Sequence, residues 1–189
     1  MPFFPKNHSV TQEALARQAK AVFEKRGRDP RAWQAYGLSL RESARLLWDH
    51  ADAAPDDASR GERFGLVLVA MMLAGLAIEV VAKASLVHRN PRLVVDGKWK
   101  GGRHDLVSLV TTTGLSIEAE ERAVLSQLSG FVKFAGRYPV PTKSEDLTPR
   151  LGAVQKGKWP TIELPPGTMV SIEARAVFET LFTRLNQRL

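Results

Sequence analysis

One stretch of the chain, residues 63–87, is apolar almost all the way round a helix and is interrupted only by Glu79 and Lys83. Its charge-free run, residues 64–78, is shorter than the roughly 18 to 20 residues that span a bilayer. A helix this apolar in a soluble chain must be surrounded by others. The sequence therefore predicts an all-α bundle with this helix at its centre and no membrane span. The residues expected to be largely buried on it are Leu68, Met72, Leu76 and Val80.

Length and composition exclude several classes of function. A chain of 189 residues suits one domain with a sizeable core. It has no cysteine, which excludes disulfides, thiolate metal sites and thiol nucleophiles. His8 and His88 have no partners at metal-ligand spacing, so we expect no metal, and no motif indicates a cofactor. No cationic segment precedes an N-terminal apolar run, so we expect a cytoplasmic protein.

The first half of the chain carries two helix starts. Ser9, with Gln12 three residues on, has the spacing of a capping box, and Gly27 ends that helix. Asp29-Pro30 is a cap residue followed by proline at the first helical position. The apolar positions expected on these two helices are Leu15, Ala19, Val22 and Phe23, then Trp33, Tyr36, Leu40, Ala44, Leu47 and Ala51.

The second half predicts three further helices and one irregular segment. Asp105 is expected to cap a short helix ending at Gly114, and Ser116 to cap the next. Residues 137–170 hold six of the eleven prolines and show little periodicity, so we expect a long irregular loop, a feature that is often functional. Ser171 opens the last helix, with Ile172, Ala176, Phe178, Leu181, Phe182 and Leu185 facing inward. The domains expected are an N-terminal arm with an amphipathic helix at 1–28 and a helical bundle at 29–189.

The charge of the chain favours an anionic partner. The net charge is +7 and the sequence pI about 10.0. Cations concentrate in residues 20–31 and in residues 89–103. A basic loop with an aromatic side chain can grip phosphates and stack on a base, and the alternative is a solvated basic loop between helices. The candidate nucleic-acid-binding residues are Arg92, Lys98, Trp99, Lys100 and Arg103.

Two charged residues lie inside the apolar helix. Glu79 and Lys83 are four residues apart, in the order that favours an ion pair on a helix. Unpaired charges are costly to bury, so we expect Arg137 or His104 to come near Glu79 and complete a polar core network. A structural role for this network is favoured over catalysis, because structural networks also perturb pKa values.

The order of four motifs resembles the HEPN superfamily of prokaryotic helical bundles. The motifs are an apolar helix reading LAGLAIEVVAKASL, a loop reading GRHDLVSLV, a helix ending in FAGRYP, and a closing amphipathic helix. The resemblance covers about residues 31–139 and the last helix. It implies a bundle of four to five core helices, commonly a homodimer. Many members are metal-independent endoribonucleases of toxin–antitoxin and phage-defence systems, and others are non-catalytic modules that bind RNA or nucleotide. The residues that carry it are Ala74, Gly75, Ala77, Glu79, Lys83, His104-Asp105-Leu106 and Gly136-Arg137-Tyr138-Pro139.

The chain departs from the catalytic pattern of that superfamily. Catalytic members carry an arginine with a histidine four to six residues downstream, late in the bundle, but no histidine follows Arg137 in this range. Arg45 and His50 match the spacing in the wrong helix, which we interpret as coincidence. We therefore expect a non-catalytic module that binds RNA, nucleotide or a cognate protein. The alternatives are a divergent metal-independent endoribonuclease using Arg137 and His104, and a purely structural dimeric bundle.

Overall fold

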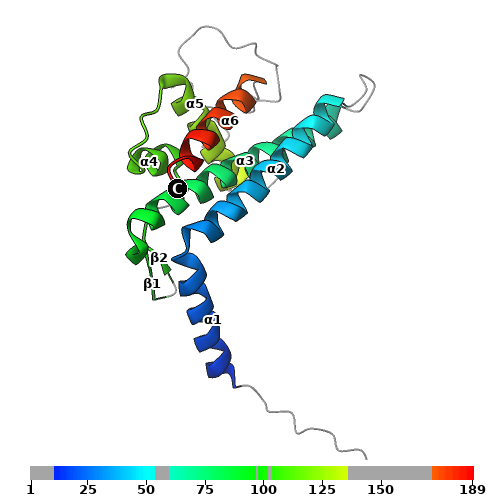
Figure 1. Ribbon diagram of the computed structural model, residues 1–189. Helices are drawn as coiled ribbons and strands as arrows, with labels where there is room; N and C mark the ends of the chain where they lie inside the picture. Colours follow the sequence, from blue (N-terminus) through cyan, green and yellow to red (C-terminus); the bar gives the residue numbers. More distant parts are fainter. Residues whose placement is uncertain (1–10, 54–59, 97, 102–103, 136–171) are drawn as a thin grey trace, which may run out of the picture.

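The computed structural model describes residues 11–53, 60–96, 98–101, 104–135 and 172–189. These residues contain six α-helices and one two-stranded sheet, so the predicted all-α class is confirmed (Figure 1). The elements in chain order are α1 Gln12–Gly27, α2 Pro30–Ala53, α3 Arg60–Arg89, the 3₁₀ turn η1 Pro91–Leu93, β1 Val94–Val95, β2 Lys98–Trp99, α4 Leu106–Thr112, α5 Ala119–Gly130, the π-helical turn η2 Phe131–Ala135, and α6 Ile172–Asn186.

The apolar helix α3 lies at the centre of the bundle, as predicted. Helix α2 packs along its length, and α4, α5, η2 and α6 contact it as well. The predicted residues face the bundle, since Val80 is buried and Leu68, Met72 and Leu76 are partly buried and pack against the core, but they are not the most buried positions of α3. A helix that is apolar all round gives no periodicity from which to choose its inner side. The fully buried positions include Ala70, Met71, Ala74, Ala77, Ile78 and Val81.

Helix α3 is also long and apolar enough to cross a membrane, by length and composition alone. The qualifying segment runs from Gly65 to Arg89, and 56% of its most apolar window is buried inside the structure. The charge-free run that ends before Glu79 is too short to span a bilayer, whereas the longer segment includes that acid and Lys83. The helices packed around α3 bury most of its residues from Ala70 to Val87, whereas Gly65 to Leu68 are partly buried and Val69 is exposed.

An aromatic cluster joins α6 to α2. The ring centroids of Trp48 and Phe178 lie 5.6 Å apart, and those of Phe178 and Phe182 lie 6.0 Å apart. Leu181 and Leu185 are buried beside them, as predicted, but Ala176 faces solvent. The apolar side of α6 is thus correctly predicted at its four largest described side chains.

Two of the predicted helix starts are confirmed and two are wrong. Helix α2 begins at Pro30, and the Asp105 side chain caps α4 by accepting from the Ser108 backbone N–H at 3.2 Å. Helix α1 begins at Gln12 with Thr11, not Ser9, as its N-cap residue. Helix α5 begins after Glu118, which forms a capping box with Glu121, whereas the Ser116 carbonyl accepts from Arg184 instead. The loop at 137–170 and Ser171 lie outside the described residues.

The basic stretch after α3 is a β-hairpin rather than the predicted loop. Strands β1 and β2 pair antiparallel, with Val94 opposite Trp99 and Val95 opposite Lys98. Asp96, the first residue between them, takes φ +53°, in the left-handed region that aspartate tolerates better than most residues. The sequence Asp96-Gly97 between two apolar residues and a tryptophan is typical of such a turn.

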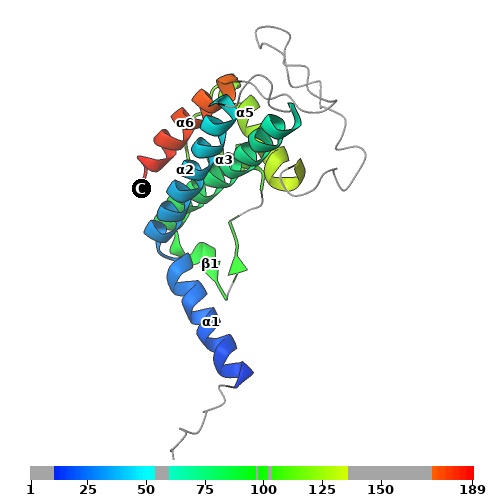
Figure 2. The same cartoon turned by 90° about the vertical axis from the view of Figure 1, so that its right-hand side faces the viewer.

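Helix α1 projects from the bundle as an arm, and two perpendicular views show this (Figures 1 and 2). Its predicted apolar side is largely exposed: Leu15 by 53%, Val22 by 46% and Phe23 by 42%. Gly27 is its only buried residue. The amphipathic pattern therefore does not mark a face that packs on this chain's own core.

Candidate functional site

Glu79 accepts two hydrogen bonds inside the bundle. Lys83, one turn further along α3, lies with Nζ 2.5 Å from Oε1. His104, in the segment before α4, lies with Nδ1 2.8 Å from Oε2. The Glu79 side chain is only 5% exposed, that of Lys83 12% and that of His104 47%. The structure thus brings Glu79, Lys83 and His104 together, and Arg137 lies outside the described residues.

The environment of Glu79 keeps it ionised. Burial alone raises the pKa of a carboxylic acid, because the charged form loses its solvent. The hydrogen bonds from Lys83 and His104, together with their charges, outweigh this effect and lower the pKa of Glu79 below its ordinary value of 4.5. A buried anion here is stabilised by two partners from different parts of the chain.

The position of His104 is fixed by the two residues that follow it. Asp105 caps α4, and the backbone N–H of Leu106 donates to the buried Ser129 Oγ on α5 at 2.9 Å. With Nδ1 directed at Glu79, that nitrogen carries the proton in the neutral ring and Nε2 is left as an acceptor. A half-exposed imidazole oriented by a buried carboxylate can exchange a proton with a ligand, which is the arrangement of a general base.

Lys83 also connects this network to the hairpin. Its Nζ lies 5.3 Å from the centroid of the Trp99 ring, in a cation–π contact. Trp99 in turn packs against Trp33 of α2, with ring centroids 5.6 Å apart. Gly101 packs closely against the Trp99 ring, because a Cβ added at this glycine would lie 2.3 Å from Trp99 Cζ2. The indole of Trp99 is therefore used to hold the hairpin on the bundle.

The end of α1 lies against the same hairpin. Gly27 packs on Val94 so closely that a Cβ would lie 2.8 Å from Val94 Cγ1. Arg28 Nε donates to the Val94 carbonyl at 3.0 Å, and Lys20 pairs with Asp96 at 3.3 Å. The Trp33 indole N–H donates to the Gly27 carbonyl at 2.8 Å and ties the arm to α2. Two basic stretches that are separate in the sequence thus form one surface.

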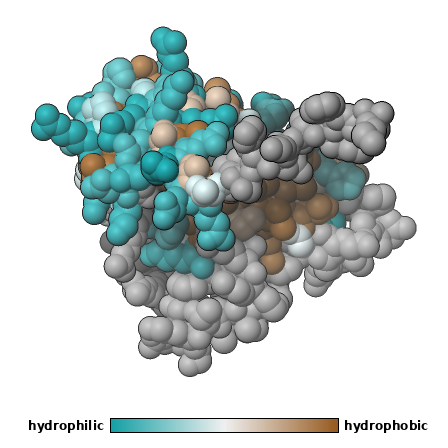
Figure 3. Space-filling view, turned by 90° about the horizontal axis from the view of Figure 1, so that it is seen from below, coloured by the Kyte–Doolittle hydropathy of each residue, from teal (hydrophilic) through white to brown (hydrophobic). Residues whose placement is uncertain are grey.

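This surface, which we call the basic surface, consists of residues 20–31 and 90–101. It carries eight lysines and arginines against three acids. The acids are already engaged: Glu24 pairs with Arg28, Asp96 pairs with Lys20, and Asp29 accepts from the Arg31 backbone. Seen from below, the described residues on the left of the view are mostly hydrophilic with a few apolar ones among them, and apolar residues gather on the right (Figure 3).

Most cations of the basic surface have no carboxylate partner within the described part of the chain. Several arginines of the bundle, by contrast, are paired: Arg41 with Glu179, Arg175 with Asp49 and Asp52, and Arg184 with Glu121. The exposed cations without such a partner among the described residues are Lys25, Arg26, Arg31, Arg92, Lys98 and Lys100.

The remaining candidates from the sequence are placed as follows. Arg45 of α2 lies near Glu42 of the same helix and near Glu179 of α6. His50 is exposed. Arg103 is outside the described residues. Among those that are described, no three His, Asp or Glu side chains gather as a metal site would require.

Sequence reasoning missed the partners that position the basic surface. The sequence predicts Trp33 only as an apolar position of its helix and Gly27 only as a helix end. The Asp96-Gly97 pair was an available signal for the hairpin, but no local pattern indicates that the hairpin meets α1.

A scan against protein-family models, a search of curated proteins and a search of solved structures each found no match to this chain.

Proposed function

We propose that this protein is a HEPN-like helical module that binds RNA through the basic surface without cleaving it. Net charge and the resemblance of its motifs support an anionic ligand. The observation that carries the proposal is the contact of α1 with the hairpin, which joins two basic stretches and leaves most of their cations without a carboxylate partner among the described residues. As the resemblance implies, we place such a module in a cytoplasmic toxin–antitoxin or phage-defence system.

Binding of this kind has a measurable electrostatic signature. Each phosphate contact to single-stranded RNA adds about 0.7 to the slope of log affinity against log salt. We expect Lys98→Gln and Lys100→Gln each to weaken binding of a single-stranded RNA and to flatten this slope by about 0.7. Both side chains are exposed, so the fold should be unaffected.

The matched control is Arg122→Gln. Arg122 is an exposed cation on α5, which lies at the other end of the bundle from the hairpin (Figure 1). This variant loses the same charge and should bind RNA with unchanged affinity and slope. Salt-insensitive or undetectable binding of RNA by the wild-type chain would overturn the proposal and favour a cognate protein as the partner.

A second candidate function, metal-independent cleavage of RNA, is supported by the orientation of His104. Its Nε2 is directed away from Glu79 and is able to accept the proton of a ribose 2′-OH. Cleavage also needs a cation to stabilise the phosphorane charge, and the sequence candidate for this is Arg137. We favour binding alone, because the superfamily's histidine is missing after Arg137.

The two candidates are separated by incubation of labelled RNA with the protein in EDTA. We expect intact RNA. Cleavage that persists in EDTA and is abolished by His104→Ala would establish the enzyme in place of the binding module. The third possibility, a purely structural dimeric bundle, predicts neither binding nor cleavage.

A further inference from the structure

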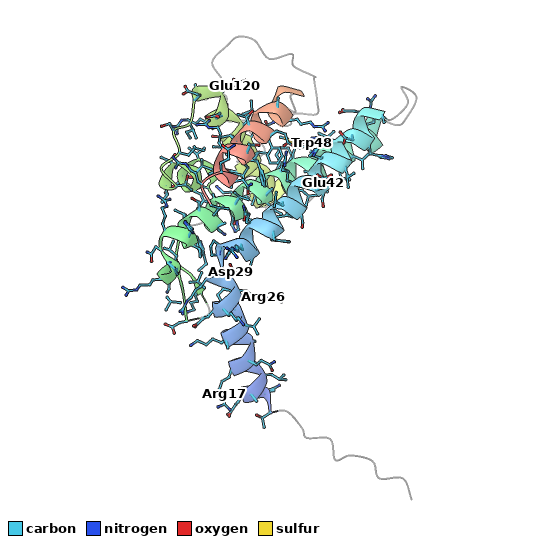
Figure 4. The ribbon with its side chains drawn as sticks, viewed as in Figure 1. Arg17, Arg26, Asp29, Glu42, Trp48 and Glu120 are labelled. Carbon is cyan, nitrogen blue, oxygen red and sulfur yellow. The ribbon has the colours of Figure 1, made fainter. Side chains whose placement is uncertain are left out.

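The arm helix α1 extends the basic surface in one direction. Arg17, Lys20, Phe23 and Arg26 follow one another at intervals of three residues, and side chains at this spacing are neighbours along a helix. All four are exposed. Figure 4 shows Arg17 and Arg26 on the arm, away from Glu42 and Trp48 in the bundle. Each step of three residues turns about 60° round an α-helix, so Arg17, Lys20 and Phe23 share one side of the arm, whereas Arg26 lies on the side opposite to Arg17. Lys20 directs this side to the hairpin through its ion pair with Asp96, and we call Arg17, Lys20 and Phe23 the arm stripe.

The length of this stripe constrains the ligand. At a rise of about 1.5 Å per residue, the ten steps from Arg17 to Gly27 cover about 15 Å. Bases stacked about 3.4 Å apart would need about four nucleotides to cover that distance. A mononucleotide at the hairpin cannot reach Arg17, whereas a polynucleotide strand can contact the hairpin and the arm together.

The arm is also built to remain accessible. Gly27 is its only buried residue, and its contacts to the hairpin are made by Lys20 in the middle of the helix and by Gly27 and Arg28 at its C-terminal end. Phe23 is 42% exposed, although an aromatic ring of this size is usually packed. A ring exposed between two cations is the pattern on which single-stranded bases stack.

We infer that the ligand of the basic surface is an extended single strand of RNA, running from the hairpin along α1, with Phe23 stacking on a base and Arg17 contacting a distal phosphate. This inference rests on the proposed function and narrows it, because it excludes a free nucleotide as the ligand. Charge complementarity along the whole stripe is the physical basis.

Length dependence tests the inference. Fluorescein-labelled oligouridylates of 4 and 12 nucleotides are titrated with the full-length protein at fixed salt, and binding is followed by anisotropy. We expect the 12-mer to bind more tightly than the 4-mer. The ratio of the two affinities should exceed the statistical factor that the additional binding positions on the 12-mer would give. Uridine monophosphate should not compete with either.

Arm variants locate the additional contacts. Arg17→Gln should weaken binding of the 12-mer by a larger factor than that of the 4-mer, because a 4-mer reaches Arg17 only when it gives up its contacts to the hairpin. Phe23→Ala should weaken the 12-mer by about 5- to 150-fold, the range for one stacked base, and Phe23→Tyr should retain most of the affinity. Lys98→Gln, at the hairpin, should weaken both oligonucleotides.

The outcomes separate this inference from the proposed function. Equal affinity for both lengths, with no effect of Arg17→Gln or Phe23→Ala, would overturn the inference and leave RNA binding at the hairpin intact. Failure of every oligonucleotide to bind would overturn both. Circular dichroism of each variant checks that α1 remains helical.

Discussion

Glu79 and His104 share a hydrogen bond of 2.8 Å although 25 residues separate them in the chain. The bond joins the centre of the apolar helix α3 to the segment that follows the hairpin. Because Lys83 binds the other carboxylate oxygen, Glu79 is held from its own helix and from a distant part of the chain. This arrangement makes the carboxylate a structural anchor with consequences that can be measured.

Replacement of Glu79 should destabilise the fold in a pH-dependent way. The pKa of Glu79 is lowered in the folded state, so the unfolded state takes up a proton more readily. The ionised Glu79 therefore contributes its full stabilisation at pH values above the pKa of the unfolded state. This contribution is lost as the pH falls through the pKa of the folded state. Glu79→Gln should lower the free energy of unfolding by about 1.5–3 kcal/mol at pH 7, the range for hydrogen bonds to charged groups.

Urea unfolding at several pH values between 7 and 3 checks this prediction. Wild type should lose stability more steeply than Glu79→Gln below the ordinary value of 4.5. Glu120→Gln, at an exposed acid on α5 (Figure 4), is the control and should behave as wild type. Parallel profiles for wild type and Glu79→Gln would contradict the proposed ionisation.

Core substitutions in α3 should report its inner side. Ile78 is fully buried, so Ile78→Ala should cost about 2–5 kcal/mol, the range for large-to-small changes in a core. Leu76 is only partly buried, so Leu76→Ala should cost less, because part of its side chain already contacts solvent. Chemical denaturation measures both, and a larger cost at Leu76 would require a different rotation of α3.

Gly101→Ala should displace Trp99. The added Cβ would lie 2.3 Å from the indole, a distance that real contacts do not reach, so the ring or the hairpin must move. We expect a change in tryptophan fluorescence and weaker RNA binding, with little effect on helix content. Gly65→Ala is a suitable control, because a Cβ there meets no described atom within 4 Å.

Assembly provides a further prediction. Large apolar side chains are exposed on α1 and α2, among them Leu15, Val22, Tyr36 and Leu46. Together with the resemblance, they lead us to propose a homodimer with twofold symmetry. Light scattering at micromolar concentration should give about twice the chain mass of 20.9 kDa, and a monomer at every concentration would refute it.

Local signals in the sequence predicted most of the fold. Asp29-Pro30 and Asp105 marked helix starts correctly, because capping depends on residues within one turn of the chain. Ser9 and Ser116 were wrong, since other residues nearby could cap as well, and tertiary context decided between them. The most buried positions of α3 were not predictable, because its apolar residues surround the helix.

The candidate site was predictable only in part. The cost of burying an unpaired charge predicted that His104 or Arg137 comes near Glu79, and the contact with His104 is confirmed. The sequence could not choose between these two residues, because the choice depends on how the chain returns after the hairpin. The same limit applies to the basic surface. Its two halves were visible as charge clusters, yet their union depends on Gly27 fitting against Val94, a long-range contact that no local pattern encodes.

Lys83 occupies a position where one ammonium group serves both a carboxylate within the bundle and an indole on the hairpin. Lys83 can contact both groups only while the hairpin keeps its position on α3. Protonation of Glu79 would remove the ion pair between Lys83 and Glu79, the stronger of the two attractions on Lys83. It would also alter the charge next to the Trp99 ring. The emission of Trp99 should therefore titrate with a carboxyl group that it does not touch, which gives an optical readout of the interior from the binding surface.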